Sequence, residues 1–430
     1  MLNEAIYYIL GFLCGDKNVS AREYLCYGNE EEFWSGEKRI LIRQSNFFDE
    51  GVFLTKKSIP IKPLQKINGI PILFGENTIE YFNDRAIINA DLVASTFYLI
   101  TRYEEIVKPN ERDEHGRFCA KDSLLFQEGY LERPIVDEYT ELLHKIFREC
   151  NIDYIETNHR ITKVWLTHDV DRPWTHYTIS TAIKTIGKTI IKEQRFDLSP
   201  ITSIWGNHTK DPKYTFHDIT IIDNQVKKKY GDLCSSVYFV KVDDKSSVND
   251  YFSDFSSSGF QKLLKYLKNK AEIGVHFSYY VGDQPEKCKQ QTEKLKKSGY
   301  FISKARFHYL HIRSPLDYSY VEESGITDDF TMGFADVSGF RLGTCRPVNW
   351  INPKTGHLSN LILHHLTIMD ATLFGKKYMN LDTDSALEYS KILIERIKEH
   401  GGELILLYHN DSYFALDFYK RIIKYITEIQ

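Results

Sequence analysis

From about residue 161 onward, short apolar runs alternate with amphipathic stretches of helical periodicity. The apolar runs lie at 164–167, 235–242, 272–276, 305–309, 340–343, 360–367 and 403–408. The helical stretches lie at 218–230, 259–270, 285–297 and 385–400, and the last ends in Gly401-Gly402, a typical helix stop. This alternation predicts an α/β fold with a parallel sheet formed as a barrel. In such folds the active residues follow the carboxyl ends of the strands.

Residues 1–155 have a different pattern. Strand-like runs at 40–42 and 70–74 are mixed with helical stretches at 91–107 and 134–148. We therefore expect a smaller, mixed α+β N-terminal accessory domain over 1–155, followed by a catalytic domain over 160–430. Six polar residues of the first domain either line a cleft against the barrel or form an ion-paired surface between the domains: Arg102, Glu104, Glu105, Asp113, His115 and Arg117.

The composition limits which classes of binding partner and which cellular compartment we expect. The 430 residues carry 55 Lys and Arg against 59 Asp and Glu, a net charge of −4, so nothing points to nucleic acid or to an anionic membrane. The apolar run 6–14 is too short to span a bilayer and does not resemble a signal peptide. Seven cysteines without a Cys-x-x-Cys pair indicate buried thiols in a reducing compartment. We predict a cytoplasmic protein without a membrane span or a nucleic-acid partner, and the oligomeric state stays open.

Side chains with catalytic chemistry follow four of the predicted strands. The first strand runs into Thr-His-Asp-Val-Asp (167–171), where two carboxylates suit a divalent metal and a general base. The third ends in a histidine, a candidate metal ligand. The fourth ends in Arg-Phe-His-Tyr (306–309), whose arginine could fix a carboxylate, and the last in Leu-Tyr-His (407–409), whose histidine could protonate a leaving group. The candidates are Asp169, Asp171, His276, Arg306, His308 and His409.

In this order, the four segments resemble the motifs of the polysaccharide deacetylase family, carbohydrate esterases that remove N- or O-acetyl groups from sugars. The family pattern is Thr-Phe-Asp-Asp, then His-Ser/Thr-x-x-x-His, then Arg-x-Pro-Tyr, and finally Leu-x-His. The corresponding segments here are 167–171, 276–280, 306–309 and 407–409, so the resemblance covers roughly 160–430. Residues 1–155 look like the extra N-terminal domain of a divergent bacterial branch, a likeness carried by 97–105, 116–118 and 134–137.

Three positions depart from the family pattern. Val170 separates the two carboxylates, Tyr280 stands where the family has its second metal histidine, and His308 replaces the proline of the third motif. The usual set of one aspartate and two histidines is therefore not intact, whereas tetrahedral zinc needs three protein ligands and an open position. We restore three ligands with Asp171, His276 and His308, with His168 as the other choice for the third.

The resemblance implies a distorted β/α barrel of the polysaccharide deacetylase type and metal-assisted hydrolysis of an acetamide or acetyl ester on a polysaccharide or glycan precursor. It implies that Asp169 is the general base, that Arg306 keeps Asp169 ionised, and that His409 protonates the departing sugar group. The cofactor would be a divalent metal, zinc before nickel or cobalt. The residues expected to contact the carbohydrate substrate are Tyr280, Tyr309 and Arg341; for Arg341, a solvated arginine in a structural turn is an equal alternative.

Two other functions stay open. With a degenerate metal site at Tyr280, the chain would be a carbohydrate-binding pseudoenzyme. With an intact site, the same barrel could hydrolyse a C–N bond that does not belong to a sugar. A cytoplasmic enzyme of the deacetylase type would act on a lipid- or nucleotide-linked intermediate of bacterial glycan biosynthesis.

Overall fold

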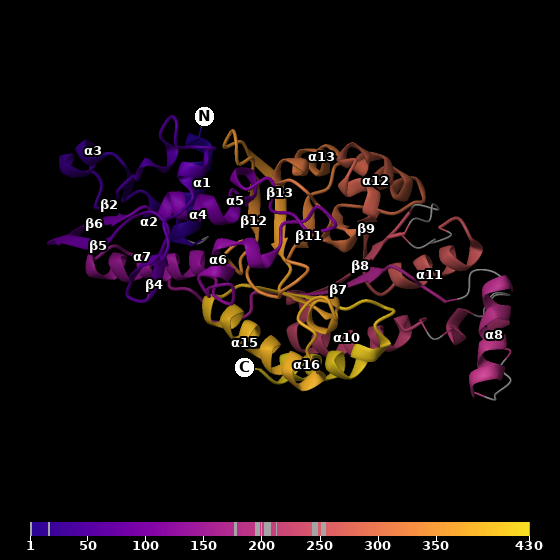
Figure 1. Ribbon diagram of the computed structural model, residues 1–430. Coiled ribbons are helices and arrows are strands. Elements are labelled where there is room, and N and C mark those ends of the chain that lie inside the picture. Colours follow the sequence, from indigo (N-terminus) through magenta and orange to yellow (C-terminus); the bar gives the residue numbers. More distant parts are fainter. Residues whose placement is uncertain are drawn as a thin grey trace.

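A nine-stranded sheet forms the larger region of the computed structural model (Figure 1). Its spatial order is β12-β13-β11-β10-β9-β8-β7-β15-β14, and neighbouring strands are parallel except for β12, which runs antiparallel to β13. The sheet curls into a half-barrel with β12 and β14 as its edges. The strands are β7 (Lys163–Val170), β8 (Cys234–Val240), β9 (Glu272–Phe277), β10 (Lys304–Phe307), β11 (Asp328–Met332), β12 (Val348–Ile351), β13 (Leu358–His365), β14 (Ile368–Met369) and β15 (Glu403–Leu407).

Most helices of this region pack on the outside of the half-barrel through their apolar faces. In α16, for example, Phe418, Ile422 and Ile426 are buried, and α16 packs against α10 and α15. The C-terminal cap of α15 is Gly401 in the left-handed conformation (φ 69°), as the glycine pair predicts. The helices are α8 (Ile179–Glu193), α10 (Phe216–Tyr230), α11 (Ser258–Lys268), α12 (Cys288–Lys297), α13 (Tyr318–Glu323), α14 (Asp370–Phe374), α15 (Thr383–His400) and α16 (Leu416–Glu428).

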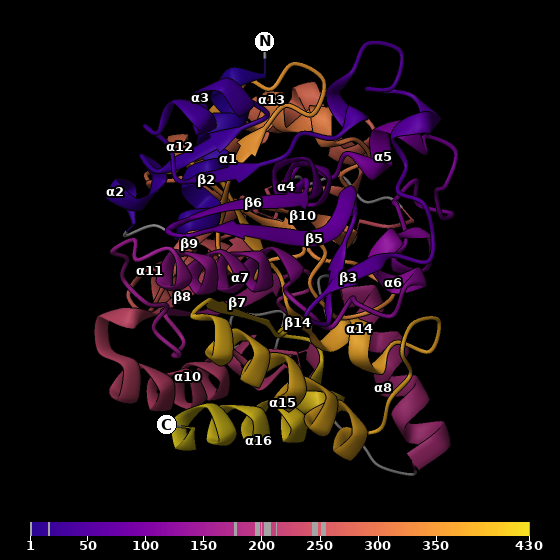
Figure 2. The same cartoon turned by 90° about the vertical axis from the view of Figure 1, so that its left-hand side faces the viewer.

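The N-terminal region is a separate, mixed α/β layer (Figure 2). Its four-stranded sheet has the order β1-β2-β6-β5, in which only the β5–β6 pair is antiparallel among the described strands. The strands are β1 (Leu25–Tyr27), β2 (Ile40–Ile42), β5 (Gly75–Phe82) and β6 (Arg85–Ala90), with a hairpin of β3 (Gln65–Ile67) and β4 (Ile70–Ile72). The helices are α1 (Asn3–Cys14), α2 (Val19–Arg22), α3 (Glu30–Ser35), α4 (Leu92–Ile100), α5 (Glu104–Val107), α6 (Leu124–Gln127) and α7 (Ile135–Glu149).

The structure describes residues 2–15, 18–175, 179–193, 198, 200–201, 208–211, 213–242, 248–250 and 255–429. Within them, no helix combines the length and the apolar character needed to cross a membrane. All seven cysteines have buried, unpaired thiols, as expected from their scattered positions. Part of the core is continuous between the two regions, because one apolar cluster contains buried residues of both.

One strand prediction differs from the structure, and some strands were not predicted. Residues 340–343 were expected to form a strand, but they form a turn between two left-handed glycines, Gly339 (φ 153°) and Gly343 (φ 66°). Phe340 and Leu342 are buried, and the backbone N–H of Phe340 donates to the carbonyl of Leu131 in the N-terminal region. Residues 340–343 are therefore apolar because they are buried between the two regions, and not because they form a strand. Strand β11, by contrast, is buried and was not predicted.

Candidate metal centre

Strand β7 presents two carboxylates on the inner face of the half-barrel. Side chains alternate between the faces of a strand, so Asp169 and Asp171 point the same way although Val170 separates them. His168 points to the opposite face, where its Nδ1 lies 2.9 Å from the carbonyl of Tyr408 and its Nε2 lies 3.1 Å from Asp223. His168 is therefore not the third metal ligand, and the alternative that named it is wrong.

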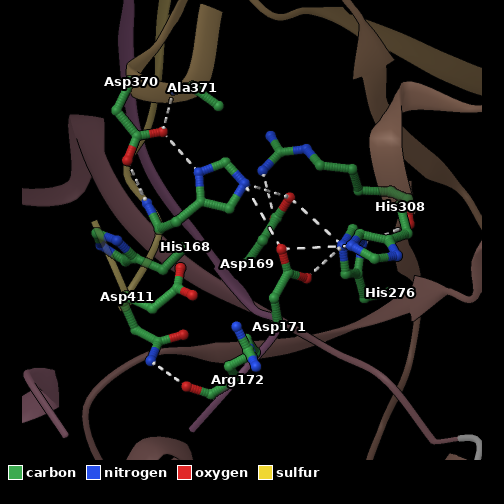
Figure 3. Close-up of polar contacts among 12 residues, drawn as sticks. His168, Asp169, Asp171, Arg172, His276, His308, Asp370, Ala371 and Asp411 are labelled. Carbon is green, nitrogen blue, oxygen red and sulfur yellow. Dashed lines mark hydrogen bonds and ion pairs between the residues drawn. The ribbon is translucent and has the colours of Figure 1, made fainter. Parts of the chain in front are cut away.

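Three side chains converge at the carboxyl ends of β7, β9 and β10 (Figure 3). His276 Nε2 lies 3.2 Å from Asp171 Oδ1, and His308 Nε2 lies 3.4 Å from Asp171 Oδ2. One ligand atom from each residue falls within 4.8 Å of the others, so the trio could hold a metal ion. Strands β8 and β9 separate β7 from β10, and the curl of the sheet brings their ends together.

The tautomers of the two imidazoles follow from what their other nitrogens contact. His276 Nδ1 lies 3.0 Å from the carbonyl of Arg306, and His308 Nδ1 lies 2.7 Å from Asp250 Oδ1. Since both partners are acceptors, each Nδ1 must donate, and a neutral ring then turns an Nε2 lone pair toward Asp171. A histidine with this kind of outer partner is the usual arrangement around a bound metal.

Buried atoms without hydrogen-bond partners fit a cation at this point. Among the described residues, neither His276 Nε2 nor Asp171 Oδ1 makes a hydrogen bond, although they lie 3.2 Å apart. Burial would raise the pKa of Asp171, but the nearby imidazoles of His308 and His276 hold it well below its usual range. Burial likewise lowers the pKa of His308, and the charges of Asp171 and Asp250 raise it above its ordinary value. The site therefore concentrates negative charge and imidazole nitrogen, the donors that zinc accepts.

Asp169 is held by a fully buried arginine. Arg306 Nη1 donates to Asp169 Oδ1 at 2.9 Å, and its other nitrogens donate to Thr167 Oγ1 and the carbonyl of Phe330, both at 3.0 Å. Burial alone would raise the pKa of Asp169, but the Arg306 guanidinium, followed by His276 and His409, lowers it. Asp169 is therefore an ionised carboxylate with one oxygen fixed and the other facing the metal trio.

His409 faces the same two aspartates from the neighbouring strand end. Its Nε2 lies 3.8 Å from Asp169 Oδ2 and 3.9 Å from Asp171 Oδ2. Its Nδ1 donates to Asp370 Oδ1 at 2.6 Å, and its backbone N–H donates to Asp370 Oδ2 at 2.9 Å. Burial lowers the pKa of His409, but Asp370, Asp171 and Asp169 together raise it to about 10. The ring is thus a cation that Asp370 orients.

A cavity of about 400 Å³ opens over these groups. Its base is polar and includes Asp169, Asp171, His308 and His409. Its walls include an apolar set formed by Leu310, Met369, Ala371, Phe374 and Phe414. A mostly apolar cleft of several hundred Å³ with a few converging polar groups is the usual form of a small-molecule site.

The three predicted substrate contacts have different positions. Tyr309 lines the cavity. Tyr280 does not, and its hydroxyl accepts a hydrogen bond from Gln291 of α12 at 3.2 Å. Arg341 is buried between the two regions, where it donates to Glu105 at 2.8 Å and to the carbonyl of Gly333 at 2.7 Å. Arg341 is therefore neither solvated nor brought to the cavity, because the N-terminal region covers it.

Sequence reasoning missed two carboxylates of the site, Asp370 and Asp250. Asp370 directly follows the apolar strand β14, which is the same signal that identified the other candidates. Asp250 accepts from His308, and its second oxygen accepts the backbone N–H of Tyr279 at 2.8 Å. It belongs to a polar stretch without periodicity, so no sequence pattern marked it.

Comparison with known proteins identifies the N-terminal region alone. Residues 4–151 match a family of unknown function, DUF7033. No curated protein matches the chain. The matched residues end before β7, so the comparisons assign no activity to the site described above.

Proposed function

We propose that the protein is a metal-dependent hydrolase that removes N- or O-linked acetyl groups from a carbohydrate, within a barrel of the polysaccharide deacetylase type. The observation that carries this proposal is the convergence of an Asp-His-His trio, an arginine-bound aspartate and an aspartate-bound histidine on one cavity. These are the groups that metal-assisted hydrolysis requires, namely ligands, a general base and a general acid.

The residues that would hold the cation are Asp171, His276 and His308. One carboxylate and two imidazoles match a catalytic zinc site, and nickel or cobalt accept the same donors. A bound cation would supply Lewis-acid polarisation of the acetyl carbonyl oxygen and would make a nearby water more acidic. His308 would supply the imidazole that the family has at the position of Tyr280. A complete set of three ligands favours an enzyme over a pseudoenzyme.

Asp169 is placed to act as the general base. Its Oδ2 lies 3.6 Å from His276 Nε2, so it borders the metal trio, while Arg306 occupies its other oxygen. In the first step, a water attacks the acetyl carbonyl carbon and gives a proton to Asp169. Arg306 keeps Asp169 ionised beforehand and fixes the direction of the free oxygen.

His409 is placed to act as the general acid. As the bond between the carbonyl carbon and the sugar nitrogen or oxygen breaks, the leaving atom takes a proton from His409 Nε2. Acetate and the free amine or hydroxyl are the products, Asp169 gives up its proton to solvent, and His409 takes up a proton from solvent, which restores both groups. Asp370 holds the His409 ring through Nδ1, so Nε2 stays directed toward the reacting atoms.

The carbohydrate part of the proposal has its own support. It rests on the resemblance of the four motifs and on aromatic groups at the cavity, Tyr309 and Tyr378, which suit the apolar faces of sugar rings. The buried, unpaired thiols support a reducing compartment, in which the substrate would be a cytoplasmic glycan precursor.

The first experiment measures zinc content and acetate release with acetylated sugar oligomers. We expect Asp169→Asn to abolish acetate release while zinc content stays near the wild-type value, and His276→Ala to lose both. His357→Ala is the matched control, since the His357 side chain is exposed and its imidazole lies 3.9 Å from Glu4. Zinc binding without turnover on any acetylated sugar would instead favour hydrolysis of a non-sugar C–N bond, to be sought with a panel of amides. If the protein binds no metal, the remaining hypothesis is the carbohydrate-binding pseudoenzyme.

A further inference from the structure

We propose that the N-terminal region completes the site, and that Arg117 is a positioning residue for the segment that carries His308 and Tyr309. The proposal rests on the metal site proposed above. Arg117 belongs to a polar turn of the N-terminal region, yet it lines the cavity together with residues of the half-barrel. Its side chain is largely buried, with 7% of it exposed.

Arg117 joins three parts of the chain. Its Nε donates to Asp113 Oδ2 at 2.9 Å within its own turn. Its Nη1 donates to the backbone carbonyl of Tyr309 at 2.7 Å, and its Nη2 donates to the hydroxyl of Tyr378 at 3.2 Å. Because Asp113 already balances the charge of Arg117, we infer that its role is to shape the site and not to attract an anion.

The segment that Arg117 holds is strained. Tyr309 and Leu310 directly follow the candidate ligand His308, and their φ values are 61° and 52°. Such left-handed conformations are unfavourable for residues other than glycine and persist only where the surroundings enforce them. The hydrogen bond from Arg117 to the Tyr309 carbonyl is one such constraint. Without it, we expect the turn to relax and to displace both the His308 ring and the cavity wall.

A second residue of the same turn supports this arrangement. His115 Nδ1 lies 3.0 Å from the hydroxyl of Tyr279, and its ring centroid lies 5.2 Å from that of Tyr309. On its other side, the Tyr309 ring lies 4.7 Å from the His308 ring. The Tyr309 ring therefore contacts both the N-terminal region and the candidate ligand His308. Through Tyr309, the N-terminal region can fix the position of His308.

The test compares zinc affinity, measured by titration calorimetry, with KM for acetylated oligomers. Arg117→Gln should weaken zinc binding on the order of 10–100-fold, the usual cost of losing an outer partner of a metal site, and should raise KM. Arg117→Lys keeps a cation beside Asp113 but not the fork that reaches Tyr309, so it should weaken zinc binding as well while retaining the wild-type melting temperature. The matched control is Arg133→Gln, which removes an equivalent arginine paired with Glu138 and a backbone carbonyl inside the N-terminal region.

The outcomes separate this proposal from the proposed function. A wild-type protein that binds no zinc would refute the metal site itself. Zinc binding by the wild type with unchanged affinity in both Arg117 variants would refute the positioning role alone. A third variant tests the mechanism: in a background with both Tyr309→Gly and Leu310→Gly the left-handed turn needs no support, so adding Arg117→Gln should no longer weaken zinc binding. A loss as large as in the wild-type background would overturn the role of the turn.

A separate observation concerns α8, from which we infer that this helix docks the protein on a membrane surface rich in anionic lipid. Helix α8 projects from the body of the molecule (Figure 1). Ile179, Ile183, Ile186 and Ile190 follow the spacing i, i+4, i+7, i+11 and so share one face. Three of them are exposed, Ile179 by 50%, Ile183 by 57% and Ile190 by 44%, whereas the equivalent stripe of α16 is buried.

The charge of α8 indicates the occupant of this face. Helix α8 contains three lysines and a single acidic residue, Glu193 at its last position, although the chain as a whole has a net charge of −4. Lys184 and Lys188 lie on the side of the helix away from the isoleucine stripe, and both are exposed. An apolar face opposite a lysine-bearing face is the pattern of helices that lie in the interface of anionic membranes. The net charge of the whole chain did not indicate a membrane partner, because the excess of lysine on α8 is local.

The test is co-sedimentation of the full chain with vesicles of phosphatidylglycerol and phosphatidylcholine, against vesicles of phosphatidylcholine alone. The wild type should bind the first and lose binding at high salt. Ile183→Asp with Ile190→Asp should abolish binding, and Lys184→Glu with Lys188→Glu should weaken it on the order of tenfold or more. Ile221→Asp, on an exposed isoleucine of α10, is the matched control. Equal binding by all variants, or a wild-type dimer that the isoleucine changes dissociate without any vesicle binding, would overturn this inference.

Discussion

His364 should make the folded protein lose stability as the pH rises through about 9. This histidine is buried at the opposite end of the half-barrel from the cavity, where strands β11, β13 and β15 begin or end. Its Nδ1 lies 2.8 Å from Glu403 and its Nε2 lies 3.0 Å from Asp328. Burial lowers the pKa of His364, but these two carboxylates raise it from 6.5 to about 9.

The magnitude follows from linkage. Each tenfold change in proton affinity is worth about 1.4 kcal/mol, so a pKa raised from 6.5 to about 9 contributes about 3 kcal/mol to the free energy of unfolding. Because the folded state has the higher pKa, this contribution is fully present below pH 6.5 and is lost as the pH rises through 9. Lys304, near the same cluster, pairs with Glu272 at 2.8 Å, and Trp165 Nε1 also donates to Glu403 at 3.3 Å.

The assay is urea-induced unfolding of the wild type and of His364→Gln at about pH 6 and about pH 10. The variant should be less stable at the lower pH by about 3 kcal/mol, and the difference should shrink toward zero at the higher pH. His357→Gln, an exposed histidine, should show no such change of the difference with pH. A stability gap that stays constant between the two pH values, or that widens on the alkaline side, would refute the reasoning.

Three further changes test contacts seen in the structure. Asp370→Asn removes the charge that orients His409, so acetate release should fall on the order of 10²–10⁴-fold while zinc affinity stays near the wild-type value. Asp250→Asn replaces the charged acceptor of the His308 Nδ1 proton with a neutral amide, so zinc affinity measured by calorimetry should fall on the order of 10–100-fold. Arg341→Met removes one of the two arginines that pair with the buried Glu105, so the free energy of unfolding should fall by about 1.5–3 kcal/mol.

Each of these three has an outcome that contradicts it. For Asp370→Asn, a drop in zinc content as large as the drop in activity would show that the residue supports the metal and not the acid. For Asp250→Asn, wild-type zinc affinity would mean that the tautomer of His308 is set by another contact. For Arg341→Met, unchanged stability would show that Glu105 is satisfied by Arg102 alone, which it also contacts.

The residue types at the strand ends were sufficient to predict two of the four carboxylates of the site, Asp169 and Asp171, together with its arginine and its three histidines. That prediction works because parallel strands end at the same edge of a sheet, so polar groups that follow successive strands gather there. The period of two along a strand also decides between neighbours, since it places Asp169 and Asp171 together and sends His168 to the other face. These choices depend only on local geometry, which the order of residues encodes.

Contacts between distant segments required the tertiary structure. His308 lies 3.4 Å from Asp171 because the curl of the sheet, and not any spacing in the chain, brings the end of β10 to the end of β7. Asp250 reaches His308 from a stretch without periodicity, and Arg117 reaches Tyr309 from the other region. The run 340–343 looked like a strand because burial by the N-terminal region selects the same apolar residues as a sheet does. Periodicity reports which side of an element is covered, whereas the identity of the covering partner depends on how the elements pack.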